Sequence, residues 1–232
     1  MISGDYSKSP LLTAGFWCTV HTRMSPVTHF LAGWLIASAT PLNRREKFAV
    51  VTAAVMPDID GLGAIPELLT RNSSHPLLWF SEYHHALHTL AFAVVVTLVS
   101  FMLSWMKGFT FGPAIHKPEI TRPWTTAVLA FLSFHSHLLG DLAGARGPDG
   151  YSWPIPYLAP FSNSCQLSWH GQWPLNGWQN ILITAILLLA TFLIAWKNGS
   201  SPLELISAAA NRKFVAALRT RFPLKSSRAT AA

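Results

Sequence analysis

The chain has 232 residues, of which 50% are hydrophobic and only 12% are charged, and its formal net charge is +7. The length suits one domain, and the charged fraction is about half of the roughly 25% usual for soluble domains. Such a composition favours a bilayer as the surrounding solvent. It also argues against a nucleic-acid partner, because the basic residues are not interleaved with aromatic residues as in a surface that follows a phosphate backbone.

Five segments are predicted to be membrane helices, which gives an all-α, multi-pass transmembrane bundle. Residues 86–106 and 178–196 are nearly free of charge and about long enough to cross a hydrocarbon core of ~30 Å. Residues 124–142 have the length but contain two histidines and an aspartate. Residues 27–40 and 46–56 are short, so we expect them to be tilted, re-entrant or packed inside the bundle.

The basic residues predict an orientation, because cytoplasmic loops of membrane proteins are enriched in Lys and Arg. If the C-terminus is cytoplasmic, 13 of the 17 basic residues fall on the inner side, and only Lys8, Arg23, Arg71 and Arg146 remain outside. We therefore expect an inner-membrane protein with its N-terminus outside and its C-terminus in the cytoplasm. The inner residues are Arg44, Arg45, Lys47, Lys107, Lys117, Arg122, Lys197, Arg212, Lys213, Arg219, Arg221, Lys225 and Arg228.

Histidines and aspartates gather at the outer end of this predicted bundle. His84 and His88 are four residues apart, as are His137 and Asp141, and residues at that spacing share one helix face. Each pair can therefore offer two ligands to one metal ion. His85 is three residues from His88, so the partner of His88 is either His84 or His85.

The same topology brings further groups to this end. His29 lies at the outer end of the first helix, and Asp58 and Asp60 lie just past the second helix, which we expect to end before Pro57. His135 points to another side of its helix than His137. Because ionisable groups near membrane depth are costly unless they pair or bind something, their convergence predicts a site.

Imidazole and carboxylate ligands suit zinc, with manganese or iron as alternatives, in a site of one or two divalent ions. A bound ion of this kind can lower the pKa of a water ligand to about 7 and so produce a nucleophile. Asp60 and His85 are expected to support the ligands or to act as the general base. The predicted ligands are His29, Asp58, His84, His88, His137 and Asp141.

These motifs resemble the LexA-regulated, YdjM-like family of membrane-bound metal-dependent hydrolases. The resemblance runs from Met24 to about Trp196, and the order of motifs is distantly similar to that of zinc-dependent phospholipase C-like proteins, which implies phosphoester substrates. The motifs are Thr28-His29, Pro57-Asp58-Ile59-Asp60, His84-His85-Ala86-Leu87-His88-Thr89 and His137-Leu138-Leu139-Gly140-Asp141.

One motif departs from the family. Many members carry His-Arg-Gly-x-Thr-His, with its two histidines five positions apart, whereas here the spacing from His84 to His88 is four and the motif has neither the arginine nor the Thr-His pair. The arginine that could engage an anionic substrate is thus absent from this motif.

The resemblance implies an integral inner-membrane hydrolase that acts, through a metal-activated water, on a lipid or other envelope ester, with membrane lipids as its surroundings. The first alternative is a transporter in which the histidines and aspartates relay protons or metal ions. The second is a non-catalytic membrane protein whose helices are held together by the metal. Continuous polar residues through the membrane would favour transport, but the third and fifth predicted helices have almost none near their centres.

The chain is expected to divide into a poorly ordered extension (1–23), a membrane-embedded, metal-binding, hydrolase-like domain (24–197) and a basic cytoplasmic tail (198–232). Met24, where the interpretable sequence begins, is an alternative start. Within the tail, residues 202–222 are predicted to form a basic amphipathic helix on anionic lipid. The polar loop 147–176 lies outside, either as a lid or substrate-binding loop, or as a set of tryptophan anchors at the interface.

Overall fold

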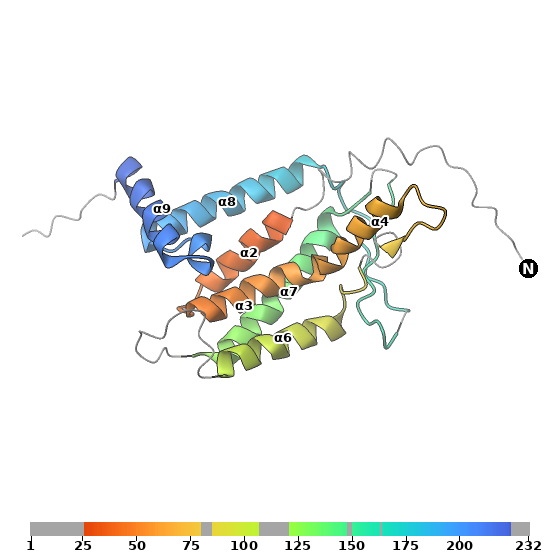
Figure 1. Cartoon of the computed structure of the whole chain (residues 1–232), viewed down its shortest axis with the longest axis horizontal. Helices are drawn as coiled ribbons and strands as arrows, with labels where there is room; N and C mark the ends of the chain where they lie inside the picture. Colours follow the sequence, from red (N-terminus) through yellow and green to blue (C-terminus); the bar gives the residue numbers. More distant parts are fainter. Residues whose placement is uncertain (1–25, 80–84, 107–120, 148–149, 163, 224–232) are drawn as a thin grey trace, which may run out of the picture.

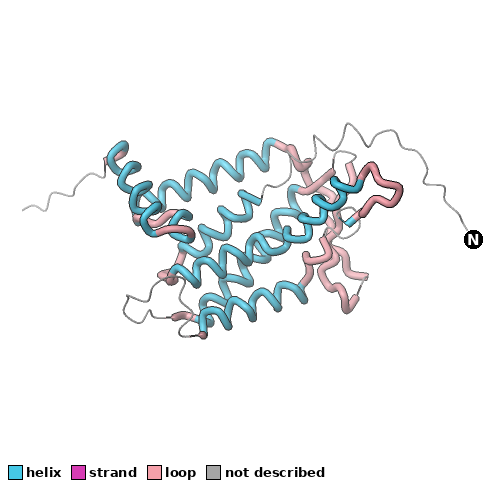
Figure 2. Tube along the Cα trace, viewed as in Figure 1, coloured by secondary structure: helices cyan, strands magenta, loops and turns pink. Residues whose placement is uncertain are grey.

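The computed structural model describes residues 26–79, 85–106, 121–147, 150–162 and 164–223. These residues contain helices and loops, two isolated β-bridges and no strand, so the all-α prediction is confirmed (Figure 2). The long helices lie lengthwise beside one another (Figure 1). In chain order the elements are α2 (Pro26–Ser38), α3 (Arg44–Val55), the 3₁₀ helix η1 (Met56–Gly63), α4 (Ala64–Thr70), α6 (Leu90–Trp105), α7 (Pro123–Gly144), α8 (Trp178–Asn198), the 3₁₀ helix η2 (Pro202–Leu205) and α9 (Ala208–Arg221).

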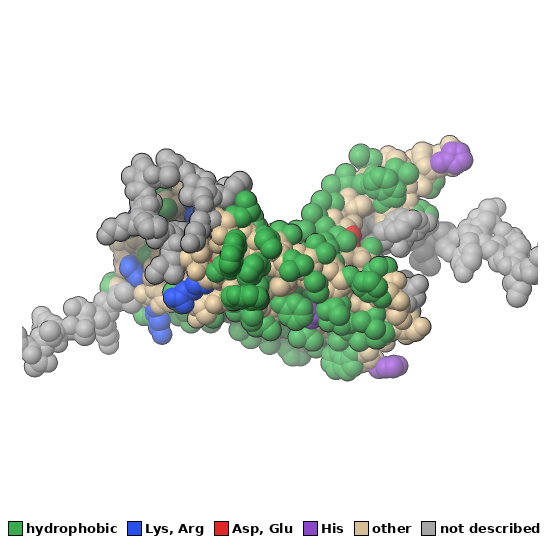
Figure 3. Space-filling view, turned by 90° about the horizontal axis from the view of Figure 1, so that it is seen from below, with side chains coloured by type: hydrophobic (Ala, Val, Ile, Leu, Met, Phe, Trp, Pro, Cys, Tyr) green, Lys and Arg blue, Asp and Glu red, His purple; other side chains and the backbone are tan. Residues whose placement is uncertain are grey.

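Within the described part of the chain, three helical segments are long and apolar enough to cross a membrane: Arg44–Thr70, which joins α3, η1 and α4, then α7 and α8. Helix α6 is apolar but shorter. The outward faces of α6 and α8 are hydrophobic, with Val95, Leu98, Ile186 and Leu189 all more than half exposed. Apolar side chains likewise cover much of the face shown in Figure 3, as expected for a bundle whose solvent is lipid.

One predicted helix boundary is confirmed and one is wrong. The second α-helix ends at Val55, with Met56 as its cap, before Pro57 as predicted, and the chain continues as the 3₁₀ helix η1, in whose first turn the fixed φ and missing N–H of proline are tolerated. The third helix begins at Leu90 rather than residue 86. His85 has φ 85°, which no α-helix accommodates, and the Thr89 side chain accepts a hydrogen bond from the N–H of Phe92, which caps the first turn of α6.

A glycine allows the close approach of the helices that carry the site. Gly33 of α2 packs where a Cβ atom would lie 2.6 Å from the Cβ of Ala54 on α3 and 3.1 Å from Oγ of Ser133 on α7. Small residues at such crossings bring helix backbones together in membranes. As a result α2, α3 and α7 pack tightly, one turn away from His29 and His137.

The opposite end of the bundle is held by a buried carboxylate and by the tail. Glu46, only 1% exposed, accepts hydrogen bonds from the Ser104 side chain and from the N–H of Arg122, which links α3 to α6 and to the start of α7. Lys47 pairs with Glu204 at 2.6 Å, and the Arg44 guanidinium donates to the carbonyls of Leu205 and Ile206 at the end of η2. The predicted tail helix is thus present as η2 and α9, with η2 held against the bundle. The extension 1–23 and residues 224–232 lie outside the described residues.

The crossing at Gly33 can be tested with two glycine substitutions. We expect Gly33→Ala to destabilise the chain by about 1–3 kcal/mol, because overpacking a tight crossing forces backbones apart. Gly61→Ala is the matched control, since nothing lies within 4 Å of its added methyl group, and we expect it to be neutral or slightly stabilising. Unfolding of the purified variants in detergent measures both. Equal stabilities would contradict the packing described.

Candidate metal centre

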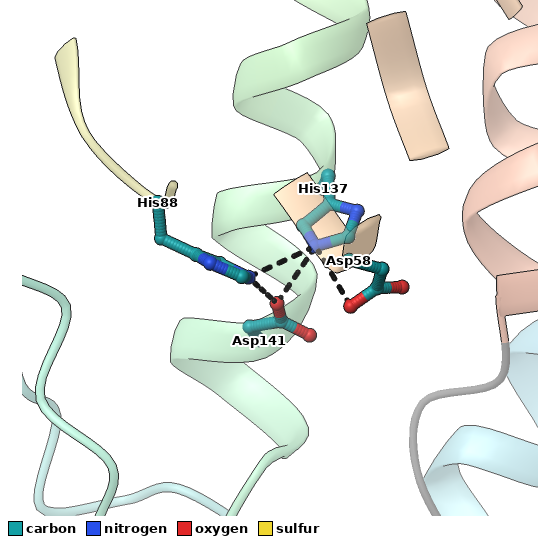
Figure 4. A group of neighbouring side chains, drawn as sticks. All are labelled: Asp58, His88, His137 and Asp141. Atoms are coloured by element: carbon teal, nitrogen blue, oxygen red, sulfur yellow. Dashed lines mark hydrogen bonds and ion pairs between the residues drawn. The ribbon is translucent and has the colours of Figure 1, made fainter. Parts of the chain in front are cut away.

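Four side chains meet at the end of the bundle opposite Glu46. His137 and Asp141 come from the last turns of α7, Asp58 from η1 and His88 from the turn before α6 (Figure 4). One ligand atom from each lies within 4.8 Å of all the others, so the group could hold a metal ion. Three segments distant in the sequence therefore contribute to one polar cluster inside an apolar bundle.

The spacing of the ligand atoms fits a small ion. Nε2 of His137 lies 3.0 Å from Oδ2 of Asp141, 3.3 Å from Nε2 of His88 and 3.6 Å from Oδ1 of Asp58, and His88 Nε2 is 3.2 Å from Asp141 Oδ2. Ligands about 2.0–2.1 Å from a tetrahedral zinc ion are about 3.3 Å from one another. The donor set and its separations thus match a mixed imidazole–carboxylate site.

A backbone carbonyl fixes the orientation of His137. Its Nδ1 lies 2.8 Å from the carbonyl oxygen of Ala54, and since a carbonyl only accepts, Nδ1 carries the proton. The lone pair of Nε2 then faces His88, Asp58 and Asp141. A metal-binding histidine is commonly held by its other nitrogen in this manner. Ala54 lies in the last turn of α3, where carbonyl groups generally have no partner within the helix.

Asp58 carries a second sign of an ion. Its Oδ2 is buried and has no hydrogen-bond partner among the described residues, although the side chain as a whole is 21% exposed. A buried carboxylate oxygen without a partner is costly. The other oxygen, Oδ1, faces Nε2 of His137, and a cation bound there would offset the negative charge of this carboxylate.

Asp60 shapes the turn that presents His88. Its Oδ2 accepts hydrogen bonds from the N–H groups of His85 (3.0 Å) and Leu87 (3.2 Å) and lies 3.7 Å from Nδ1 of His88. The His85 ring stacks on the His88 ring with centroids 4.5 Å apart. The prediction that His88 shares a helix face with a histidine is therefore wrong, because this segment is a turn before α6. His84 lies outside the described residues.

The two carboxylates on either side of His88 also control its charge in the metal-free protein. Burial opposes protonation, but hydrogen bonds and charges from Asp141 and Asp60 outweigh it and raise the pKa of His88 from 6.5 to about 9. The cluster therefore attracts positive charge, which a proton or a metal ion can supply.

His29 lies next to the group of four. Its Nε2 is 3.3 Å from Oδ1 of Asp141, the oxygen turned away from His88 and His137, and its ring stacks on the His137 ring at 3.7 Å. Of the predicted ligands, the structure thus brings Asp58, His88, His137 and Asp141 together and places His29 against the second oxygen of Asp141. His135 is engaged elsewhere, between the Phe131 carbonyl and the Tyr157 hydroxyl.

The outer loop contributes contacts that the sequence does not reveal. Gln172, 1% exposed, donates to the carbonyl of Asp141, and the N–H of Trp173 donates to that of Ala143. Both carbonyls belong to the last turn of α7, whose acceptors lack partners within the helix. Trp153 lies 5.2 Å from the His85 ring, whereas His170 is exposed. A single glutamine in a polar loop carries no pattern that would have singled it out.

The raised pKa of His88 predicts a pH dependence for the metal-free chain. Its folded pKa of about 9 exceeds the unfolded value of 6.5, so the stabilisation is complete below pH 6.5 and is lost as pH rises through 9, by up to about 3 kcal/mol. Thermal unfolding in detergent with a chelator, from pH 6 to 9.5, measures this loss. We expect His88→Gln to flatten the profile; an unchanged profile would mean that another group titrates.

Comparison with known proteins identifies the family. A family model described as "YdjM inner membrane protein" matches residues 24–220, most of the chain and all elements from α2 to the end of α9 except its last residue. No curated protein and no solved structure matches it. The membrane helices and the extent of this match lead to one conclusion: the chain belongs to the YdjM inner membrane protein family.

Proposed function

We propose that this protein is an inner-membrane hydrolase that uses one bound divalent metal ion, zinc in the first instance, to cleave a lipid or other envelope ester. The observation that carries the proposal is the group of four ligand atoms within 4.8 Å of one another, two imidazoles and two carboxylates, at one end of an apolar bundle. Such a donor set suits zinc and admits manganese or iron. The resemblance to metal-dependent hydrolases supports ester cleavage.

The group has a closed side and an open side. His88, His137 and Asp141 are separated by 3.0–3.3 Å, and the side chains of both histidines are 0% exposed. Asp58 is the most exposed member, at 21%. A catalytic zinc has three protein ligands and one position for water or substrate. With His88, His137 and Asp141 as the three ligands, that position would lie beside Asp58. The ion, when bound, supplies Lewis acidity and a water of lowered pKa.

The roles of Asp60 and His85 can be separated. Asp60 already accepts two backbone N–H groups, so it holds the turn and orients His88. His85 is the better base, because its ring lies directly against His88 and beside Trp153 of the outer loop. A base in this place would accept a proton from water during ester cleavage.

The distribution of charge supports a site at the outer face. Most of the described basic side chains gather at the end of the bundle that carries α9 (Figure 3), and the histidine–aspartate group lies at the other end, with Arg71 and Arg146 (Figures 1 and 4). Because the basic end of a membrane protein is cytoplasmic, the group would face the outside. Substrates available there are lipids and other esters of the envelope.

The packing counts against a transporter. Between the group and Glu46, the centre of the described bundle holds apolar side chains that include Ala53, Ala93, Ala130 and Phe134. The hydroxyl groups of Ser100, Thr126 and Ser133 are also buried there, but no ionisable side chain is among the described buried residues of this region. A relay of protons or ions needs polar groups at intervals through the membrane. A metal that only holds the helices together is the other alternative, and activity measurements distinguish it.

Metal content is the first test. We expect the purified wild-type chain to retain about one zinc ion per molecule, and His88→Ala and Asp141→Ala to lose it, because each removes one of the closely spaced ligands. His170→Ala, which changes an exposed histidine, is the control. Elemental analysis after gel filtration in detergent measures the ratio. Full metal in both ligand variants would refute the site.

Hydrolysis is the second test. We expect the zinc-loaded chain to cleave at least one member of a panel of phosphate and carboxylate esters, with loss of turnover in Asp141→Ala. His85→Ala should keep its zinc and lose about 10–100-fold in kcat. Zinc retention without turnover, together with unfolding on chelation, would support the structural metal instead. Zinc or proton flux in proteoliposomes would support the transporter.

A further inference from the structure

An apolar groove runs along the bundle and reaches the metal centre. It has a volume of about 520 Å³ and lies against α2, α3 and η1, with η2 and Ile206 at its far end. Among its lining residues only Thr52 and Asp58 have polar side chains. The lining residues are Pro26, Phe30, Phe48, Val51, Thr52, Val55, Met56, Asp58, Ile59, Leu62, Pro202, Leu205 and Ile206.

The groove is longer than one half of a bilayer is thick. Its lining runs from Phe48 of α3 to Leu62 of η1. At about 1.5 Å per residue in an α-helix and 2.0 Å in a 3₁₀ helix, this stretch covers roughly 25 Å. One leaflet of hydrocarbon is about 15 Å thick. The whole of a hydrocarbon chain of a membrane lipid can therefore lie within the groove.

The polar end of the groove is part of the metal centre. Asp58 lines the groove, and its Oδ1 lies 3.6 Å from Nε2 of His137. A molecule bound here would have an apolar portion in the groove and a polar portion beside the ligand group. That distribution of polarity is complementary to an amphiphile with a long chain, and not to a small polar ester.

The residues at the rim of the groove are exposed at the surface of the bundle. Phe48 and Ile59 are each 45% exposed, Leu62 is 60% exposed and Ile206 is 78% exposed. In an inner-membrane protein this surface faces lipid, so an acyl chain can enter sideways from the bilayer. Burial of its methylene groups among these side chains also replaces contacts with neighbouring lipids at little cost.

From this continuity we infer that the groove binds one acyl chain of a membrane phospholipid and directs its ester end to the metal centre. The inference rests on the proposed function only in taking the ester as the group that is cleaved. It specifies the substrate class as a lipid rather than a water-soluble ester, and it assigns specificity to residues of α2, α3 and η1.

Photolabelling tests the groove without requiring turnover. The zinc-loaded full chain in detergent is irradiated with phosphatidylglycerol that carries a diazirine in one acyl chain, and labelled residues are identified by mass spectrometry. We expect saturable labelling at Phe30, Thr52 and Val55 that unlabelled phosphatidylglycerol suppresses. Thr52→Trp, which fills the groove, should reduce it at least tenfold, and Ile59→Glu, at a half-exposed position, should reduce it as well.

Val95→Trp on the outward face of α6 is the matched control and should leave the labelling unchanged. Groove labelling no stronger than labelling of the α6 face, or unaffected in folded Thr52→Trp and Ile59→Glu, would overturn the inference. Labelling that appears only after removal of residues 1–23 would also overturn it, since that segment would then be the occupant. Asp141→Ala should lose zinc and turnover but keep the labelling, which separates failure of the groove from failure of the proposed hydrolase.

Discussion

The carboxylate of Asp141 is the group on which the arrangement of this bundle depends. One oxygen lies 3.0 Å from His137 and 3.2 Å from His88, and the other lies 3.3 Å from His29. These contacts tie the last turns of α7 to α2 and to the turn before α6. Inside an apolar bundle such groups are tolerated only when each has a partner, so the cluster specifies how the three segments meet.

Irregular backbone segments help to position the side chains around this carboxylate. Pro57 lies where α3 changes into a 3₁₀ helix, which presents Asp58, and the carbonyl of Ala54 in the last turn of α3 orients His137. His85, whose φ is positive, lies at the start of the described turn that Asp60 holds and that presents His88 to the cluster. Glu46 and the docked tail secure the other end of the bundle.

The sequence predicts the helices and those side chains that share a helix face at regular spacing. The spacing of His137 and Asp141, four residues apart on a long apolar helix, predicts that they face one site, and their side chains lie 3.0 Å apart. The all-α membrane bundle follows from composition and segment length. The sequence could not predict the geometry around His88, because a residue with positive φ interrupts the helical spacing that His84 and His88 suggested. The roles of Gln172 and of the Ala54 carbonyl could not be predicted either. Each contact joins a side chain to a backbone carbonyl that only the tertiary fold brings close.

A metal at the end of an apolar groove would connect both features of the molecule, the polar cluster and the lipid-facing bundle. The most direct measurement is the X-ray absorption spectrum of the zinc-loaded protein at the zinc edge. We expect only nitrogen and oxygen neighbours at about 2.0–2.1 Å, with the signature of two imidazoles. Sulfur at about 2.3 Å, or a protein that retains no zinc to measure, would contradict a site built on His88, His137 and Asp141.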